Sequence, residues 1–266
     1  MSLHVVVSVV LPCYNTPSAF LREAVQSVLA QDVDRVEVLL VDDVSTDGSI
    51  QVAESLAHEH PRVRLIRRIT NGGPAAARNT GLHAATGRYI CFLDSDDQYA
   101  PGFFSSAVGI LEADATISGM ATGMELLNPH RPIHPRQLEA MVASHPSNLF
   151  LRRAVVDLLG GFSEDPGFRG KSAGEDIAFR RALARHFRIV QTNSAFFRYR
   201  VRPGSHLDRF LDRSRVINDQ LVLSPLPDDD PPELFNDALH QYLVQVAERV
   251  GIISGLTHSP AAVSYT

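Results

Sequence analysis

The chain has 266 residues, 44% of them hydrophobic, with Lys+Arg 25 against Asp+Glu 30 and a formal net charge of -5. A core sufficient for one or two domains is expected, and the charge gives no electrostatic case for nucleic acid or an anionic membrane surface. Cys13 and Cys91 lie in apolar runs and are predicted to be buried thiols of a reducing compartment. The N-terminal apolar run is interpreted as a strand, and no stretch of about 18 apolar residues occurs. A cytoplasmic protein without a membrane span is therefore expected.

The first hundred residues alternate between short apolar runs and segments with helical spacing. The runs predict strands over 5–11, 36–41, 63–66 and 89–93, and the spacing predicts helices over 20–29, 50–57 and 74–85. This β-α-β-α-β-α-β order predicts a parallel sheet covered by helices on both faces.

Polar motifs follow three of these predicted strands. They are Pro12-Cys13-Tyr14-Asn15, Asp42-Asp43 and Asp94-Ser95-Asp96-Asp97. Because ligands bind beyond the carboxyl ends of the strands in such sheets, the three motifs are expected to converge on one site. The crowded carboxylates of the last motif repel one another, and Mg²⁺ or Mn²⁺ bound through oxygen would relieve that repulsion. A merely solvated acidic turn is the alternative.

The remaining chain predicts a less regular pattern. Helices are expected over 103–111, 137–142, 153–159 and 175–186, strands over 117–127, 149–151, 188–191 and 195–200, and a loop over 128–135. A polar helix to about residue 221 and an acidic, proline-rich linker over 224–232 follow. An amphipathic helix over 233–250 ends the pattern, and its apolar stripe is expected either to pack on the domain or to form a homodimer.

Three further motifs have two interpretations each. The segment 41–49 holds carboxylates at a strand end and also several good helix caps. The segment 71–81 is a glycine turn that enters a helix carrying Arg78. It indicates either an anion bound at the helix N-terminus or a tight turn whose arginine pairs with a nearby aspartate. Glu175 and Asp176 open a helix, where acidic side chains also stabilise the dipole.

Taken together, these motifs make the chain resemble the family 2 glycosyltransferases. The resemblance runs in order from Ser8 to about His206 and includes Gly160-Gly161-Phe162 and Gly174-Glu175-Asp176. It implies an α/β GT-A fold, which is a Rossmann-like three-layer α/β/α arrangement around a mixed, mostly parallel sheet. It further implies a GT-A domain over 1–206, with a nucleotide-binding half over about 1–100 and an acceptor half over about 101–206. Residues 207–266 would form a C-terminal helical extension.

The resemblance implies an enzyme that moves a sugar from a nucleoside-diphosphate sugar, with UDP favoured, to a carbohydrate or glycoconjugate acceptor. Asp176, with Glu175 beside it, matches the family's general base. Asp96 would coordinate Mn²⁺ or Mg²⁺ together with Asp94, which also lies near the ribose. The other residues implied to bind the nucleotide sugar are Pro12, Tyr14, Asn15, Asp42, Asp43, Arg78, Ser95 and Arg202.

Two positions depart from the family pattern. Arg202 stands where many relatives have a histidine, and an arginine cannot ligate a metal, although it can bind a diphosphate. His206 is the substitute metal ligand to consider, and a solvated loop histidine is the alternative. Val44 replaces the glycine of the common Asp-Asp-Gly-Ser motif, so the turn is expected to differ slightly, because a β-branched residue disfavours positive φ.

The implied chemistry is an inverting displacement with a metal as Lewis acid and a carboxylate as base. A non-catalytic module that binds a nucleotide sugar or a protein partner is the alternative, and the Arg202 replacement is its one sign. A nucleotidyltransferase or a nicotinamide dehydrogenase is disfavoured, because no glycine-rich loop follows the first predicted strand.

Overall fold

The computed structural model describes residues 6–168, 174–224 and 232–254. In these ranges the helices are α1 (Ser18–Leu29), α2 (Ser49–Glu59), α3 (Gly73–Ala84), α4 (Phe103–Ala113), α5 (Pro135–Ser144), α6 (Arg153–Leu159), α7 (Glu175–His186), α8 (His206–Arg213) and α9 (Pro232–Ser254), with short 3₁₀ helices η1 (Pro146–Asn148) and η2 (Pro166–Phe168). The strands are β1 (Val7–Cys13), β2 (Val36–Asp42), β3 (Val63–Arg67), β4 (Tyr89–Phe92), β5 (Gln98–Tyr99), β6 (Gly119–Ala121), β7 (Met124–Leu127), β8 (Leu149–Arg152), β9 (Ile189–Gln191), β10 (Phe197–Arg200), β11 (Ser214–Ile217) and β12 (Gln220–Leu223).

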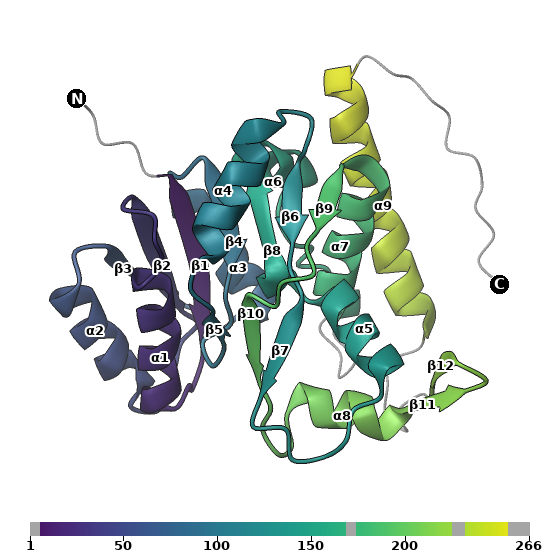
Figure 1. Cartoon of the computed structure of the whole chain (residues 1–266), viewed down its shortest axis with the longest axis horizontal. Coiled ribbons are helices and arrows are strands. Elements are labelled where there is room, and N and C mark those ends of the chain that lie inside the picture. Colours follow the sequence, from purple (N-terminus) through teal and green to yellow (C-terminus); the bar gives the residue numbers. More distant parts are fainter. Residues whose placement is uncertain (1–5, 169–173, 225–231, 255–266) are drawn as a thin grey trace.

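A central sheet of seven strands runs in the order β3-β2-β1-β4-β8-β6-β9 (Figure 1). Strands β1 to β4 are parallel to their neighbours among themselves, and β8 is antiparallel to both β4 and β6. The predicted mixed, mostly parallel sheet is confirmed. Its four N-terminal strands coincide with the four predicted ones. β1, β2 and β4 are buried at nearly every position, as strands covered on both faces require, whereas the edge strand β3 exposes Arg64 and Arg67.

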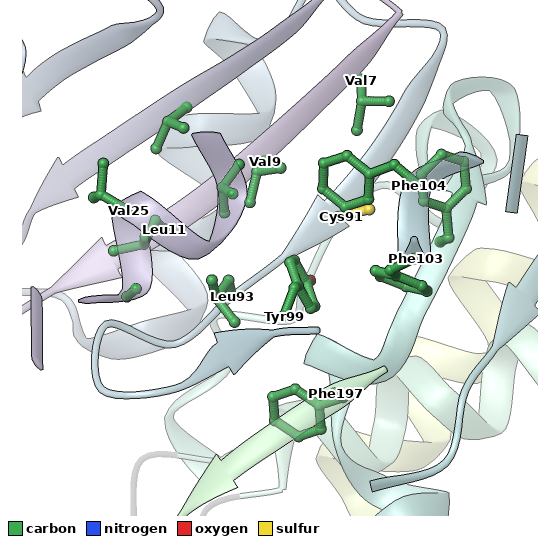
Figure 2. Packing of buried hydrophobic residues seen from close by; sticks show 14 of the residues in the cluster. Val7, Val9, Leu11, Val25, Cys91, Leu93, Tyr99, Phe103, Phe104 and Phe197 are labelled. Carbon is green, nitrogen blue, oxygen red and sulfur yellow. The ribbon is translucent and has the colours of Figure 1, made fainter. Parts of the chain in front are cut away.

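Two hydrophobic clusters lie on opposite faces of this sheet. Val9 and Leu11 of β1 belong to the first, with residues of α1, α2 and α4, while Val10 belongs to the second, with residues of α3, α6 and α7. Successive strand residues point to opposite faces, so one apolar run supplies both clusters. Figure 2 shows the first cluster, in which Phe103 and Phe104 of α4 pack near Cys91. The result is the expected three-layer α/β/α arrangement.

A second sheet, in the order β5-β10-β7, lies beyond the carboxyl end of β4. The single strand predicted over 117–127 is therefore wrong: β6 joins the central sheet, whereas β7 pairs with β10. Residues Thr122 and Gly123 separate the two, and backbone bonds from both of them to other segments allow the chain to change sheets there. Strand β10 ends at Arg200, and Arg202 follows it; both arginines contact Asp96 of the acidic motif.

The predicted polar helix over 207–221 is also wrong in its second half. Helix α8 ends at Arg213, and β11 and β12 then form an antiparallel hairpin. Its turn residues, Asn218 and Asp219, have φ values of 49° and 62°. Asn and Asp accept this left-handed conformation more readily than other side-chain-bearing residues, and two such residues between β-branched and aliphatic segments are typical of a tight hairpin.

The C-terminal helix α9 packs on the domain through its apolar stripe. Ala238, Leu239, Tyr242 and Val246 are buried in the second cluster, and the Tyr242 hydroxyl donates to the Gly161 carbonyl at 2.7 Å. Of the two expectations for this stripe, packing within the chain is confirmed, and these residues are no longer available to hold a second copy. Among the described helices, none combines the length and apolar character needed to cross a bilayer.

Candidate functional site

A cavity of about 1090 Å³ lies beyond the carboxyl ends of β1, β2 and β4, where ligands bind in open α/β sheets. Among the sequence-predicted site residues, all but Asn15 and Asp42 line it. Those that do are Pro12, Tyr14, Asp43, Arg78, Asp94, Ser95, Asp96, Glu175, Asp176, Arg202 and His206. The predicted convergence of the three polar motifs is therefore observed, joined by the start of α7 and the loop after β10.

Asn15 and Asp42 instead hold the turns that frame the cavity. The Asn15 side chain accepts from the Thr46 backbone N–H at 2.8 Å, and the Asp42 carboxylate accepts from the Ser45 N–H at 3.3 Å. Val44, which precedes Ser45 in this turn, adopts a φ of 66°. The left-handed turn thus forms despite the β-branched side chain, contrary to the expected change, at a conformational cost of about 1–2 kcal/mol.

Asp43 fixes the glycine turn that enters α3. Its buried carboxylate accepts from Arg68 Nε at 2.8 Å and from the backbone N–H groups of Gly72 and Gly73 at 3.1 and 2.8 Å. Further along α3, a Cβ at Gly81 would lie 2.4 Å from Val10 Cγ1, so a glycine is required for the helix to approach β1. The 71–81 segment is therefore held against the sheet from both ends, which positions Arg78 between them.

Arg78 connects the acidic motif to the start of α7. Its guanidinium is buried, donates to Asp94 Oδ1 at 2.9 Å and to Glu175 Oε1 at 3.2 Å, and lies 5.1 Å from the centre of the Phe162 ring. Burial opposes its charge, but the carboxylates of Asp94 and Glu175 outweigh burial and raise the pKa of Arg78. Burial likewise opposes the charged form of Asp94, and Arg78 nevertheless lowers the pKa of that carboxyl. Both residues therefore stay ionised.

Asp96 and Asp97 have different surroundings although they are adjacent. The Asp96 carboxylate pairs with Arg202. Asp97 is buried, its Oδ1 accepts from the Arg200 N–H at 2.8 Å, and its Oδ2 has no hydrogen-bond partner among the described residues. Burial, followed by the charges of Asp96 and Asp94, raises the pKa of Asp97 well above its usual range. An unpartnered buried carboxylate oxygen is costly, and a bound cation would satisfy it.

The acidic motif has the donors that a divalent cation requires. Ligand atoms of Asp94, Asp97 and His145 all lie within 4.8 Å of one another. The Nδ1 atom of His145 accepts from the Ser147 N–H at 3.2 Å, so the proton of the neutral ring is on Nε2, which faces Asp94 Oδ2 at 3.7 Å. Ligation therefore falls to carboxylate oxygens, which suit Mg²⁺ or Mn²⁺. Asp96 is within this motif, but its assignment as a ligand stays a prediction.

Glu175 and Asp176, which open α7, are separated by their contacts. Both line the cavity, but Glu175 is held by Arg78, whereas Asp176 accepts, among the described residues, from the Ile177 N–H next to it at 2.7 Å. Burial, followed by the charge of Glu175, raises the pKa of Asp176 to about 6. A carboxylate with a pKa in this range can accept a proton near neutral pH.

Several lining residues were not among the predicted site residues. Asp97 belongs to the acidic motif, so its position was visible in the sequence. His145, Arg181 and Arg209 also line the cavity. They are single residues on helices or at a helix end, with no motif around them, and only the packing of α5, α7 and α8 around the sheet brings them to the site.

Comparison with known proteins identifies the family. The family model for glycosyl transferase family 2 matches residues 8–163. An uncharacterized glycosyltransferase of Haemophilus influenzae is 45% identical over 91 residues, which are 34% of this chain and 36% of that protein. The chain therefore spans a minor part of this curated relative.

Two solved structures share the fold. TarS 1-349 of S. aureus, in complex with UDP-GlcNAc, aligns with a TM-score of 0.68 and 22% identity over 91% of this chain and 67% of that one. The mannosyltransferase PcManGT of Pyrobaculum calidifontis, in complex with GDP-Man and Mn²⁺, aligns with a TM-score of 0.59 and 21% identity over 97% and 77% of the two chains. The fold is thus the expected GT-A fold, and with a family model that matches over half of its length, this chain belongs to glycosyl transferase family 2.

Proposed function

We propose that the protein is a metal-dependent, inverting glycosyltransferase that moves a sugar from a nucleoside-diphosphate sugar to a hydroxyl of a carbohydrate or glycoconjugate. The observation that carries this proposal is that Asp176, a carboxylate with a raised pKa, lines the same cavity as the acidic motif. Arg78 fixes the spacing between them by holding Asp94 and Glu175. The proposed base and the proposed site for a cation-bound diphosphate thus line the same cavity.

The donor nucleotide belongs on the sheet side of this cavity. Pro12 and Tyr14 would line the nucleotide pocket, and the Asp43 carboxylate, which is fixed by Arg68 and the glycine turn, would meet the base. Ser95, whose hydroxyl lies 2.6 Å from that of Thr16, ties the acidic motif to the β1 loop. UDP is the expected nucleotide, and TarS, which shares the fold, binds UDP-GlcNAc.

The reaction needs stabilisation of a leaving diphosphate and removal of one proton. When bound by the Asp94-Ser95-Asp96-Asp97 motif, Mn²⁺ or Mg²⁺ supplies Lewis-acid stabilisation of the diphosphate oxygens. Asp176 accepts the proton of the acceptor hydroxyl while the oxygen forms a bond to the anomeric carbon and the bond to the diphosphate breaks. A single attack from the side opposite the leaving group inverts the anomeric centre. Arg202, next to Asp96, is a permanent cation that can contact the departing diphosphate.

Calorimetric titration with UDP, GDP and dTDP, each with and without Mn²⁺, tests this proposal. Mn²⁺-dependent binding of one nucleotide is expected, and it identifies the donor class. A folded sample that binds none of the three nucleotides would instead support a non-catalytic module, for which the Arg202–Asp96 pair is the observation in favour.

A further inference from the structure

Helices α7 and α8 contribute a set of mostly basic residues to the cavity lining, which we call the arginine wall: Arg181 of α7 with His206, Arg209, Phe210 and Arg213 of α8. The four α8 residues follow one another at spacings of three, one and three positions, so they form a single stripe of that helix. Leu211, outside the stripe, is buried in the core. Helix α8 is therefore oriented so that its basic stripe lines the cavity.

The carboxylates of the cavity and the arginine wall are carried by different segments of the chain. Every described carboxylate residue in its lining lies at a strand end or at the start of α7: Asp43, Asp94, Asp96, Asp97, Glu175 and Asp176. In contrast, the described lining residues from α8, β12 and α9 include no carboxylate. The strand ends and the start of α7 thus supply the negative charge of the cavity, while α8 supplies only basic and uncharged residues to its lining.

Two guanidinium groups of the arginine wall have no acidic partner among the described residues. Arg78 and Arg202 are each paired with carboxylates at the acidic motif. Arg181 and Arg209 form no such ion pair within the described chain, and both side chains are exposed to the cavity and solvent. Arginine is a strong donor for phosphate and carboxylate groups, because its fork matches both bidentately. Arg181 and Arg209 line the same cavity as Asp176, and with no carboxylate partner in the described chain they can pair with an anionic ligand.

We propose that the arginine wall binds an anionic acceptor, which is a sugar or polyol chain bearing phosphate or carboxylate groups close to the hydroxyl that is glycosylated. This inference rests on the proposed function, because it places the accepting hydroxyl at Asp176. Arg181 lies five residues after Asp176 on α7, about 7.5 Å along the helix axis, and both residues line the cavity. Phe210, on the same stripe as Arg209, supplies an apolar surface for a sugar or polyol face.

The test uses the full chain saturated with Mn²⁺ and the nucleoside diphosphate that binds, so that the proposed donor site is filled. Three probes of matched length are titrated: a glycerol phosphate oligomer, a galacturonate oligomer and a neutral malto-oligosaccharide. At least one anionic oligomer is expected to bind about tenfold or more tightly than the neutral one, with an affinity that falls as salt rises. The two anionic arms distinguish a phosphate-bearing acceptor from a carboxylate-bearing one.

Charge removal then assigns the binding to the wall. The variant with both Arg181→Gln and Arg209→Gln is expected to lose about tenfold or more of the affinity for the anionic oligomer, because hydrogen bonds from a charged guanidinium to an anion are stronger than those from a neutral amide. Arg185→Gln is the matched control, because Arg185 is an exposed arginine of α7 outside the cavity lining. Nucleotide affinity is expected to stay unchanged in both variants.

Three outcomes overturn the inference or separate it from the proposed function. Equal binding of neutral and anionic oligomers overturns it. Loss of nucleotide affinity in the double variant, with oligomer binding intact, also overturns it, because the arginines then serve the donor. If no nucleotide binds while the anionic oligomer, titrated into the chain with Mn²⁺ alone, binds through Arg181 and Arg209, the glycosyltransferase proposal fails and the anion-binding wall stands.

Discussion

Arg78 Nη1 and Glu175 Oε1 lie 3.2 Å apart although 97 positions separate the two residues in the sequence. Through Asp94, the same guanidinium also contacts the acidic motif after β4. The pair therefore connects the nucleotide-binding half predicted from the sequence to the helix that carries Asp176. The distance between the proposed metal site and the proposed base depends on this buried arginine.

We expect Arg78→Ala to destabilise the fold by about 3–5 kcal/mol, because two carboxylates would lose their buried counterion. Urea unfolding measures the effect. Arg198→Ala is the control, since Arg198 pairs with Glu125 at the surface and such pairs contribute about 0–1 kcal/mol. Equal losses in the two variants would contradict the role of Arg78 as the central counterion.

The Asp176→Asn variant tests the base. We expect kcat to fall by about 10²–10⁴-fold, with nucleotide affinity and fold retained, because an amide cannot accept the acceptor proton. Asp157→Asn, at an exposed carboxylate of α6, should leave turnover unchanged. Near-normal turnover in Asp176→Asn would assign the proton transfer to another group.

The raised pKa of Asp176 predicts a pH profile. Burial and then the Glu175 charge raise it from the ordinary value of 3.8 to about 6. Because the charged form acts as the base, log(kcat/KM) should be level above this pH and decline as pH falls below about 6. A profile without this acidic limb would contradict the assignment.

The free energy of unfolding should depend on pH in the opposite direction to the activity, because protonated Asp176 favours the folded state. A carboxyl whose pKa is higher in the folded state than in the unfolded state binds its proton more tightly when folded. The stability that it contributes is fully present below its unfolded pKa and is lost as pH rises through about 6. The free energy of unfolding, measured from pH 4 to 7 for the natural chain relative to Asp176→Asn, should therefore decline across this range. A flat difference would mean that the carboxyl titrates at its ordinary value.

Arg202 and a divalent cation both have access to Asp96. We expect Arg202→Gln to tighten Mn²⁺ binding several-fold without nucleotide, because one competing positive charge is removed from the Asp96 carboxylate. Asp96→Asn should weaken the same binding by about tenfold or more. The free Mn²⁺ signal in paramagnetic resonance reports both. If Mn²⁺ binding is the same in the natural chain and in Asp96→Asn, the predicted ligand role of Asp96 is wrong.

The accuracy of the sequence analysis differs between the two halves of the chain. The four parallel strands were predicted within a few residues, and for β1, β2 and β4 the reason is that a strand covered on both faces must be apolar at almost every position. The hairpin at β11 and β12 was missed, although Asn218-Asp219 between aliphatic segments is a local hairpin signal. The division into a domain over 1–206 and an extension over 207–266 stays a prediction, as do the individual catalytic and binding roles.

The sequence by itself determined which strands end in polar motifs, and parallel topology then required those ends to meet at one edge of the sheet. Only the tertiary structure decided which charges are neutralised. Asp42 faces its own turn, Glu175 is held by Arg78, and Asp176 forms no direct ion pair within the described chain. The Asp42 contact is local, but the Arg78–Glu175 pair joins residues that are 97 positions apart. The docking of α7 beside α3 creates that pair, and the periodicity of a single segment carries no information about it.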